Sequence, residues 1–208
     1  MAILTLSILA LAYFCGSIPN GYLAGRLRGI DVRDHGSGNI GATNVLRVLG
    51  KPWGFAVFFL DAFKGFAAVR LTLLLVSQNE GAERYVEFFA ILAAAICVLG
   101  HSFPIWLKFK GGKGVATSAG ALFGVTPIAA IAIFLVWLLI FQLTRYVSVA
   151  SVTAALALPV CVGVLVAHGT HGMVLLYFSL AMTAMVVWRH RANFARLRDG
   201  TEQRFARK

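Results

Sequence analysis

An uncharged run in the second half of the chain, residues 114–144, reads GVATSAGALFGVTPIAAIAIFLVWLLIFQLT. A membrane-spanning helix needs about 20 predominantly apolar residues. The run of 31 residues is therefore too long for one span and short for two. Gly124 and Pro127 stand where a break would fall, because proline starts or kinks a helix. The surrounding charges decide between six spans and seven.

The composition places most of the chain in lipid. Of its 208 residues, 59% are hydrophobic and only 13% are charged, and the mean hydropathy is +0.81. A soluble domain of this length could not bury so much apolar surface. Residues 1–25, 88–100 and 146–188 are also free of charge. We expect a single membrane-embedded domain over residues 1–208 and no separate soluble domain.

The positive charges favour the seven-span alternative. The net charge is +11, and the bases gather at 26–51, at 108–113, at Arg145 and at 189–208. With a turn at 124–127, 16 of the 19 Lys and Arg residues lie on one side, which the positive-inside rule makes cytoplasmic. We therefore expect an all-α membrane protein with an outside N-terminus and a cytoplasmic C-terminus. Its seven helices would cover about 2–24, 53–76, 86–103, 114–125, 128–143, 148–167 and 171–188.

The first polar loop on that side, GSGNIGATN at 36–44, is rich in hydrogen-bond donors. Its glycines free backbone N–H groups, and Ser37, Asn39 and Thr43 flank them. Such a nest beside Arg47 suits an anion. The alternative for this loop alone is a solvated turn with an arginine that snorkels to the membrane interface.

A short interfacial helix is expected to follow this loop. Thr43 or Asn44 would cap its beginning, because short polar side chains satisfy the first N–H groups of a helix. Gly50 would end it, with Arg47 close to its first turn.

The second polar loop, KFKGGKGVATS at 108–118, leads into a predicted helix. Gly111, Gly112 and Gly114 would let an anion approach the backbone, and Lys113 would add a point charge at the positive end of the helix. The loop is not a Walker A motif, because glycine follows Lys113 where that motif has Ser or Thr. A flexible basic loop that touches anionic lipid is the alternative.

Two further polar faces lie on the same side. Ser148 and Ser151 are three residues apart near the start of a helix, where capping is the usual role of serine. His190 and Asn193 share a helical face beside several arginines. Together with the two glycine-rich loops, these residues predict a site for two phosphates or one diphosphate that opens onto lipid.

Two charged residues, Asp61 and Lys64, fall inside a predicted span at i and i+3. Charge inside a membrane is costly and is a functional candidate by default. Here we favour a neutralising pair that ties helices together, and we expect His101 to be structural.

Five stretches resemble a known family: GSIPNGYLAGRLRGIDVRDHGSGNIGATN (16–44), DAFKG (61–65), GHSFPIWLKFKGGKGVATS (100–118), RYVSVAS (145–151) and RHRANFARLRDGTE (189–202). They are similar to the bacterial membrane glycerol-3-phosphate acyltransferases that use acyl phosphate. The resemblance runs in order over nearly the whole chain.

The resemblance implies seven helices and transfer of a fatty acyl group from acyl phosphate to the 1-hydroxyl of sn-glycerol 3-phosphate. The products would be lysophosphatidate and phosphate, in the first acylation of phospholipid synthesis. The enzyme would be a multi-pass protein of the bacterial cytoplasmic (inner) membrane with its active site facing the cytoplasm. A soluble acyl-phosphate-producing enzyme would be its upstream partner. No metal, cofactor, nucleotide or nucleic acid is implied.

On this basis the two substrates are assigned to separate residue sets. Glycerol phosphate would be bound by Ser37, Arg47, Lys113, His190 and Asn193. Acyl phosphate would be bound by Gly111, Gly112, Gly114, Thr43 and Ser151, and Asn39 is a further substrate-binding residue. The proton of the attacking hydroxyl would pass to His190 or, in the alternative that we favour, to an acyl-phosphate oxygen. No cytoplasmic carboxylate is expected to be well placed to accept this proton, since Asp31 and Asp34 precede the first glycine-rich loop and Asp199 and Glu202 lie beyond the tail helix.

A transporter or exchanger of anionic phosphate metabolites is the alternative from another class. Such a protein needs polar groups at mid-membrane and access from both sides. Only Asp61 and Lys64 reach inward here, whereas the other polar residues crowd one face. Acyl transfer is therefore the preferred interpretation.

Overall fold

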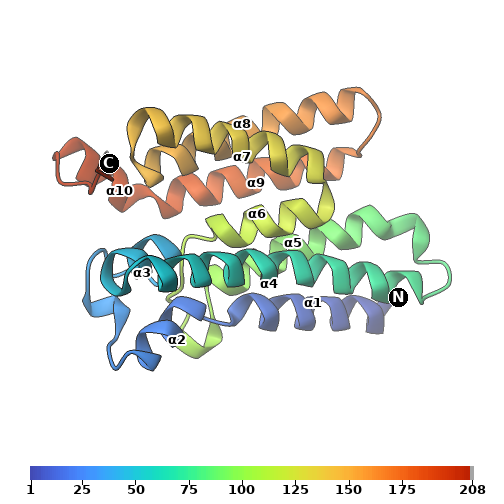
Figure 1. Ribbon diagram of the computed structural model, residues 1–208. Coiled ribbons are helices and arrows are strands. Elements are labelled where there is room, and N and C mark those ends of the chain that lie inside the picture. The colour runs from blue at the N-terminus through green and yellow to red at the C-terminus, as the bar shows by residue number, and fades with distance from the viewer. Residues whose placement is uncertain (207–208) are drawn as a thin grey trace. The chain divides into compact units, whose positions relative to one another are not determined.

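The computed structural model describes residues 1–206, and every regular element within them is helical (Figure 1). The chain divides into two compact units, Met1–Val125 and Thr126–Lys208. Each unit is a set of packed helices, which agrees with the predicted all-α class.

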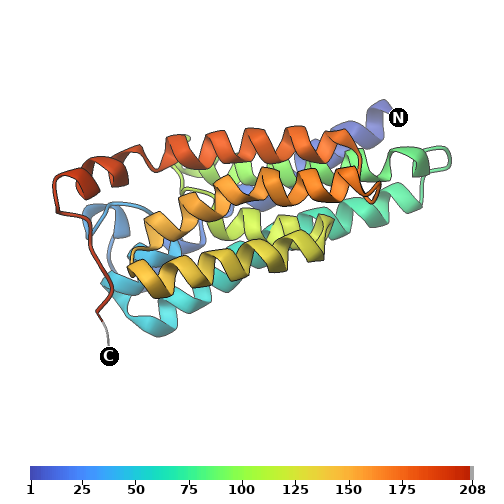
Figure 2. The same ribbon diagram turned by 90° about the horizontal axis from the view of Figure 1, so that it is seen from above.

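Unit 1 contains six α-helices and three short 3-10 turns. They are α1 (Ala2–Ser17), α2 (Asn20–Leu27), η1 (Val32–Asp34), α3 (Ala42–Leu49), α4 (Lys51–Ser77), η2 (Glu83–Tyr85), α5 (Val86–Ser102), η3 (Ile105–Leu107) and α6 (Val115–Val125). Helix α4 packs against α1, α5 and α6, and α5 also packs against α1. Helices α2 and α3 and the loop before α6 lie at the end of this unit that is opposite the N-terminus (Figures 1 and 2).

Close helix packing in unit 1 depends on small residues. A Cβ on Gly16 of α1 would lie 2.0 Å from the carbonyl oxygen of Cys97 on α5. A Cβ on Gly120 of α6 would lie 1.7 Å from the carbonyl oxygen of Ala62 on α4. Packing of backbones at this range is typical of helices in lipid, where small residues let neighbouring helices approach.

The predicted first helix, 2–24, is wrong as a continuous element. Helix α1 ends at Ser17 and α2 begins at Asn20. Pro19 has no N–H to donate, and its ring disfavours helical geometry at Ile18, whose ψ is 113°. The break exposes the Ile18 carbonyl oxygen, which accepts a hydrogen bond from Lys64 Nζ at 2.7 Å.

Unit 2 contains α7 (Pro127–Thr144), α8 (Val147–Ala167), α9 (Met173–Arg189) and α10 (Arg191–Arg198). Helix α8 packs against both α7 and α9. The chain bends by 48° between α9 and α10. The predicted break near Gly124 and Pro127 is confirmed, because α6 ends at Val125 and α7 starts at Pro127.

Four segments of the described chain are long and apolar enough to cross a membrane: Ala2–Leu27, Glu83–Leu107, Pro127–Thr144 and Val147–Ala167. Met173–Arg189 adds a fifth when it is joined to Arg191–Arg198. Helix α4, which carries four charged residues, is not among them, and α6 is short at 11 residues. The number of seven spans stays a prediction.

Candidate functional site

The first glycine-rich loop is held by the side chain of Asn44. Its Oδ1 accepts the N–H of Ser37 at 2.8 Å, and its Nδ2 donates to the carbonyls of Val32 and His35 at 3.0 and 3.1 Å. Gly36 has a φ of +60°, and a Cβ there would lie 2.3 Å from Asn44 Oδ1. The buried amide of Asn44 therefore fixes the shape of the loop.

The start of α3 differs from the prediction. Gly41 stands at the N-cap, so the predicted capping by Thr43 or Asn44 is wrong. Asn44 lies in the first turn, where its side chain reaches back to the loop instead of to the helix N–H groups. Asn39 Oδ1 accepts the N–H of Gly41 at 2.8 Å and shapes the entry to the helix. Gly50 ends α3 with a φ of +89°, as predicted.

Hydroxyl and guanidinium groups gather around this loop. Ser37 is exposed, while Thr43 and Arg47 are half-buried one turn apart on α3. Asp31 precedes this loop, and hydrogen bonds from Arg33 lower the pKa of its carboxyl to about 2. That carboxylate is therefore a poor proton acceptor at neutral pH.

The second glycine-rich loop folds back onto the end of α5. Gly111 N–H donates to the Ser102 carbonyl at 3.1 Å, and Gly112 N–H donates to the His101 carbonyl at 3.2 Å. A Cβ on Gly112 would lie 2.1 Å from His101 Nε2. These two amides thus satisfy terminal carbonyls of α5. The part of the loop that follows them carries the remaining residues of the predicted site.

That part of the loop is Lys113 and Gly114 at the start of α6. Gly114 has a φ of +81°, and its carbonyl oxygen accepts the N–H of Ser118 at 2.7 Å. Lys113 is half-buried beside the positive end of the helix dipole. Both loops rest on one apolar cluster, which includes Val32, Ile40, Val45 and Leu107.

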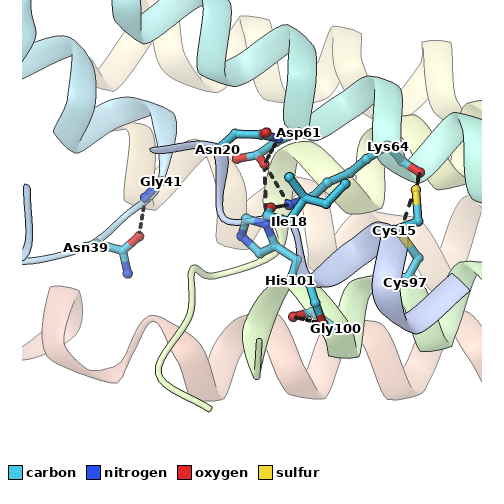
Figure 3. A network of polar contacts seen from close by, with 11 residues as sticks. Cys15, Ile18, Asn20, Asn39, Gly41, Asp61, Lys64, Cys97, Gly100 and His101 are labelled. Atoms are coloured by element: carbon cyan, nitrogen blue, oxygen red, sulfur yellow. Dashed lines mark hydrogen bonds and ion pairs between the residues drawn. The ribbon is translucent and has the colours of Figure 1, made fainter. Parts of the chain in front are cut away.

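A buried polar network connects α4 with the break after α1 and with the end of α5 (Figure 3). Asp61 Oδ1 lies 2.8 Å from Lys64 Nζ, 3.0 Å from Asn20 Nδ2 and 3.7 Å from His101 Nδ1. Lys64 also donates to the carbonyl oxygen of Ile18. The predicted Asp61–Lys64 pair is confirmed, and it ties three segments of unit 1 together.

In unit 2, Glu202 accepts hydrogen bonds from three side chains. Its Oε1 accepts from Ser148 Oγ at 2.8 Å and from Asn193 Nδ2 at 2.6 Å, and its Oε2 accepts from Arg196 Nε at 2.7 Å. Burial raises the pKa of Glu202, but the three hydrogen bonds together lower it more, so the net pKa is below its ordinary value. Glu202 lies beyond α10, as expected, but the chain folds back after that helix, so its carboxylate contacts the predicted site residue Asn193.

The C-terminal tail is anchored on the corner between α7 and α8 (Figure 2). Phe205 N–H donates to the Arg145 carbonyl at 3.0 Å, and the Phe205 ring meets the Phe141 ring edge-on. Arg204 Nε donates to the Thr144 carbonyl at 3.1 Å. These contacts explain why Glu202 reaches back to Asn193.

His190 stands at the junction of α9 and α10 and is 3% exposed. Its Nδ1 lies 2.8 Å from the Val186 carbonyl oxygen, which can only accept, so Nδ1 is the donor in this hydrogen bond. Asn193 N–H donates to the His190 carbonyl, which keeps the two residues on one turn.

Ser151 on α8 accepts a hydrogen bond from Trp137 Nε1 at 3.1 Å.

The predicted site residues thus fall into two sets. Unit 1 holds Ser37, Asn39, Thr43, Arg47, Gly111, Gly112, Lys113 and Gly114, and unit 2 holds Ser151, His190 and Asn193. Sequence reasoning missed Asn44 and Glu202 as organisers of these sets. A second asparagine at the end of the glycine-rich run was a signal for Asn44. For Glu202 the signal was an acidic residue in a largely basic tail, shortly after the helical face that carries His190 and Asn193.

The amino-acid sequence of this chain matches a known protein family. Residues 6–200 match the family model described as glycerol-3-phosphate acyltransferase. A glycerol-3-phosphate acyltransferase of Aquifex aeolicus (strain VF5) is 43% identical over 200 residues, 96% of this chain and 98% of that protein. One of Gloeobacter violaceus is 46% identical over 200 residues, 96% of this chain and 94% of that protein.

Two solved structures are also similar. The glycerol 3-phosphate form of PlsY, an integral membrane glycerol 3-phosphate acyltransferase, matches with a TM-score of 0.85 and 41% identity, covering 97% of this chain and 96% of that chain. The lysophosphatidic acid form matches with a TM-score of 0.82 and 40% identity, covering 97% and 95%.

Proposed function

We infer the reaction from the family, since the chain belongs to the glycerol-3-phosphate acyltransferases. It transfers a fatty acyl group from acyl phosphate to the 1-hydroxyl of sn-glycerol 3-phosphate. The products are 1-acylglycerol 3-phosphate (lysophosphatidate) and phosphate. The observation that supports this chemistry most directly is the imidazole of His190, which the carbonyl of Val186 holds in a fixed orientation at the junction of α9 and α10.

The protein itself needs to supply little covalent chemistry in this reaction. The hydroxyl oxygen attacks the acyl carbon and forms the new ester bond, while the bond from that carbon to the bridging phosphate oxygen breaks. Phosphate leaves with the electron pair. Because the donor is already activated, the protein needs to align two anionic substrates and stabilise the charge that develops on the carbonyl oxygen.

The residues of both units are given separate roles in this proposal. Glycerol phosphate is bound by Ser37, Arg47, Lys113, His190 and Asn193. Acyl phosphate is bound by Asn39, Thr43, Gly114 and Ser151, while Gly111 and Gly112 act through the shape of their loop. The cationic groups neutralise the phosphates, and charge-assisted bonds of this kind are about twice as strong as neutral ones.

The proton of the attacking hydroxyl passes to an oxygen of the acyl phosphate, and His190 orients that hydroxyl. Asp31 and Glu202 are unsuitable bases, because hydrogen bonds hold the pKa of each carboxyl below its ordinary value. Substrate assistance needs no further side chain. It also leaves the leaving group protonated at the moment it departs.

For the topology we propose seven spans, an outside N-terminus and a cytoplasmic C-terminus. Within unit 1 the basic loops at 28–41 and 103–114 lie at one end and the loop at 78–85 lies at the other (Figure 1). Within unit 2, α10 and the α7–α8 corner share one end, as the bonds of Glu202 and Phe205 require. This arrangement suits an enzyme of the bacterial cytoplasmic membrane that receives acyl phosphate from a soluble enzyme upstream.

The reaction can be tested with purified protein in lipid vesicles. Palmitoyl phosphate and labelled glycerol 3-phosphate should give labelled lysophosphatidate and one equivalent of phosphate. Uptake of labelled glycerol 3-phosphate into the vesicles without acylation would instead favour a transporter.

A further inference from the structure

The ionisable group of Asp61, Lys64 and His101 takes no part in the reaction proposed above, yet its side chains are only 3–5% exposed. Charges in a membrane-embedded region are costly. Replacing a buried ion pair by apolar residues often leaves a protein equally or more stable. A need for stability therefore explains this group poorly, and a need for defined geometry explains it better.

The contacts of this group lead from Asp61 on α4 to His101 near the end of α5 (Figure 3), and His101 borders Gly112 of the second glycine-rich loop. Asp61 Oδ1, held by Lys64 and Asn20, lies 3.7 Å from Nδ1 of His101. The other ring nitrogen of His101, Nε2, lies 2.1 Å from where a Cβ of Gly112 would be. The carbonyl of His101 also accepts the N–H of Gly112. His101 therefore stands between the carboxylate and the loop.

We propose that Asp61 and His101 are positioning residues that set the conformation of the loop 110–114 and thereby place Lys113 for a substrate phosphate. Lys113 follows Gly112 directly, so a shift of Gly112 moves the lysine backbone by a comparable distance. The proposal rests on the function proposed above, because it takes the phosphate to belong to a substrate. In this proposal Asp61 holds the imidazole by electrostatic attraction across 3.7 Å, and the imidazole fixes the loop.

Two substitutions of His101 separate its two edges. His101→Asn keeps a polar group near Asp61 and withdraws from Gly112, whereas His101→Gln places an amide where Nε2 stood. We expect His101→Asn to lower kcat/KM by about 10-fold or more, and His101→Gln to recover part of that loss. If the two variants lose activity equally, the edge that faces the loop is irrelevant and the proposal fails.

A double-mutant cycle tests the path through Lys113. If His101 acts by placing Lys113, His101→Asn should cost less than about threefold in a Lys113→Ala background, because the placed residue is gone. In an Arg47→Ala background the same change should still cost about 10-fold. Independent, multiplying losses at His101 and Lys113 would overturn the proposal.

Amide hydrogen exchange tests the loop without any assay of activity. In His101→Asn the amides of residues 108–114 should exchange faster, because their conformation has lost its support. Thr72→Val, another fully buried polar site on α4, should leave that exchange unchanged. Unchanged loop exchange in His101→Asn would contradict the proposal. If the wild-type protein does not acylate glycerol 3-phosphate, the proposed reaction fails, while the exchange result still decides the positioning role.

Discussion

The side-chain amide of Asn193 donates a 2.6 Å hydrogen bond to Oε1 of Glu202. The same oxygen accepts from Ser148 Oγ, so one carboxylate links the start of α8 to α10. This bond fixes the direction in which the Asn193 amide faces. The substrate-binding role proposed for Asn193 thus depends on a carboxylate that itself does no chemistry.

Glu202 should make stability depend on pH. Its folded pKa is below the ordinary value of 4.5, so its contribution is complete above that value and is lost as the pH falls through the folded pKa. Glu202→Gln should therefore unfold at a lower temperature than wild type at pH 7, and the difference should narrow below about pH 4.5. Thermal unfolding in detergent measures it. Asp199→Asn, at an exposed ion pair, is the matched control and should change little. If the difference in unfolding temperature between wild type and Glu202→Gln stayed constant with pH, it would contradict this role.

Arg47 and Lys113 should each matter more than a nearby exposed lysine. Arg47→Ala and Lys113→Ala each remove a charge-assisted contact of about 1.5–3 kcal/mol, which corresponds to roughly 10–100-fold in kcat/KM. Lys108→Ala, in the exposed part of the same loop as Lys113, should do much less. Steady-state kinetics with both substrates varied measure the effects. Similar losses at Lys108 and Lys113 would indicate a general attraction of charge.

Substitutions of His190 separate orientation from general-base catalysis. If His190 only orients the hydroxyl, His190→Gln or His190→Asn should restore much of the activity that His190→Ala loses, and the pH profile should persist. If His190 is the general base, every substitution of it should lower kcat by about 10²–10⁴-fold. We expect partial rescue. If the folded Gln and Asn variants are as inactive as Ala, His190 is the base.

The sequence predicted the features that depend on neighbouring residues. The break at Pro127 followed from the length of one uncharged run together with the charges around it, and the Asp61–Lys64 pair followed from their spacing inside a span. Pro19 shows the limit of such reasoning. Pro159 lies inside α8 without ending it, whereas Pro19 ends α1. The difference is that the Ile18 carbonyl oxygen, just before Pro19, accepts a hydrogen bond from Lys64, a residue distant in sequence.

The parts of the site that the sequence did not reveal depend on contacts between distant segments. Glu202 reaches Asn193 only because the tail returns to the corner between α7 and α8. Gly111 and Gly112 have the composition of an anion-binding loop, yet their N–H groups bind carbonyls of α5. A glycine-rich motif does not reveal whether the missing Cβ makes room for a ligand or for a neighbouring side chain. At Gly112 it makes room for His101.

The proposed topology predicts which positions face each side of the membrane. In a variant without Cys15, Cys97 and Cys161, a cysteine at Glu80 or Thr170 should react with an impermeant reagent from outside. Cysteines at Lys110 or Asp199 should react only after permeabilisation. All four side chains are exposed, so a failure to react cannot be explained by burial within the protein. Labelling of position 110 from outside would contradict the seven-span arrangement.

The choice of acyl donor tests the proposed reaction most directly. Purified protein should be given glycerol 3-phosphate with palmitoyl phosphate, palmitoyl-CoA or palmitoyl-acyl carrier protein, and lysophosphatidate should be measured. We predict product with palmitoyl phosphate and none with the two thioesters, because the residues assigned to the donor bind a phosphate and not a nucleotide or pantetheine. Robust turnover of palmitoyl-CoA, or no product from palmitoyl phosphate, would contradict the proposed reaction.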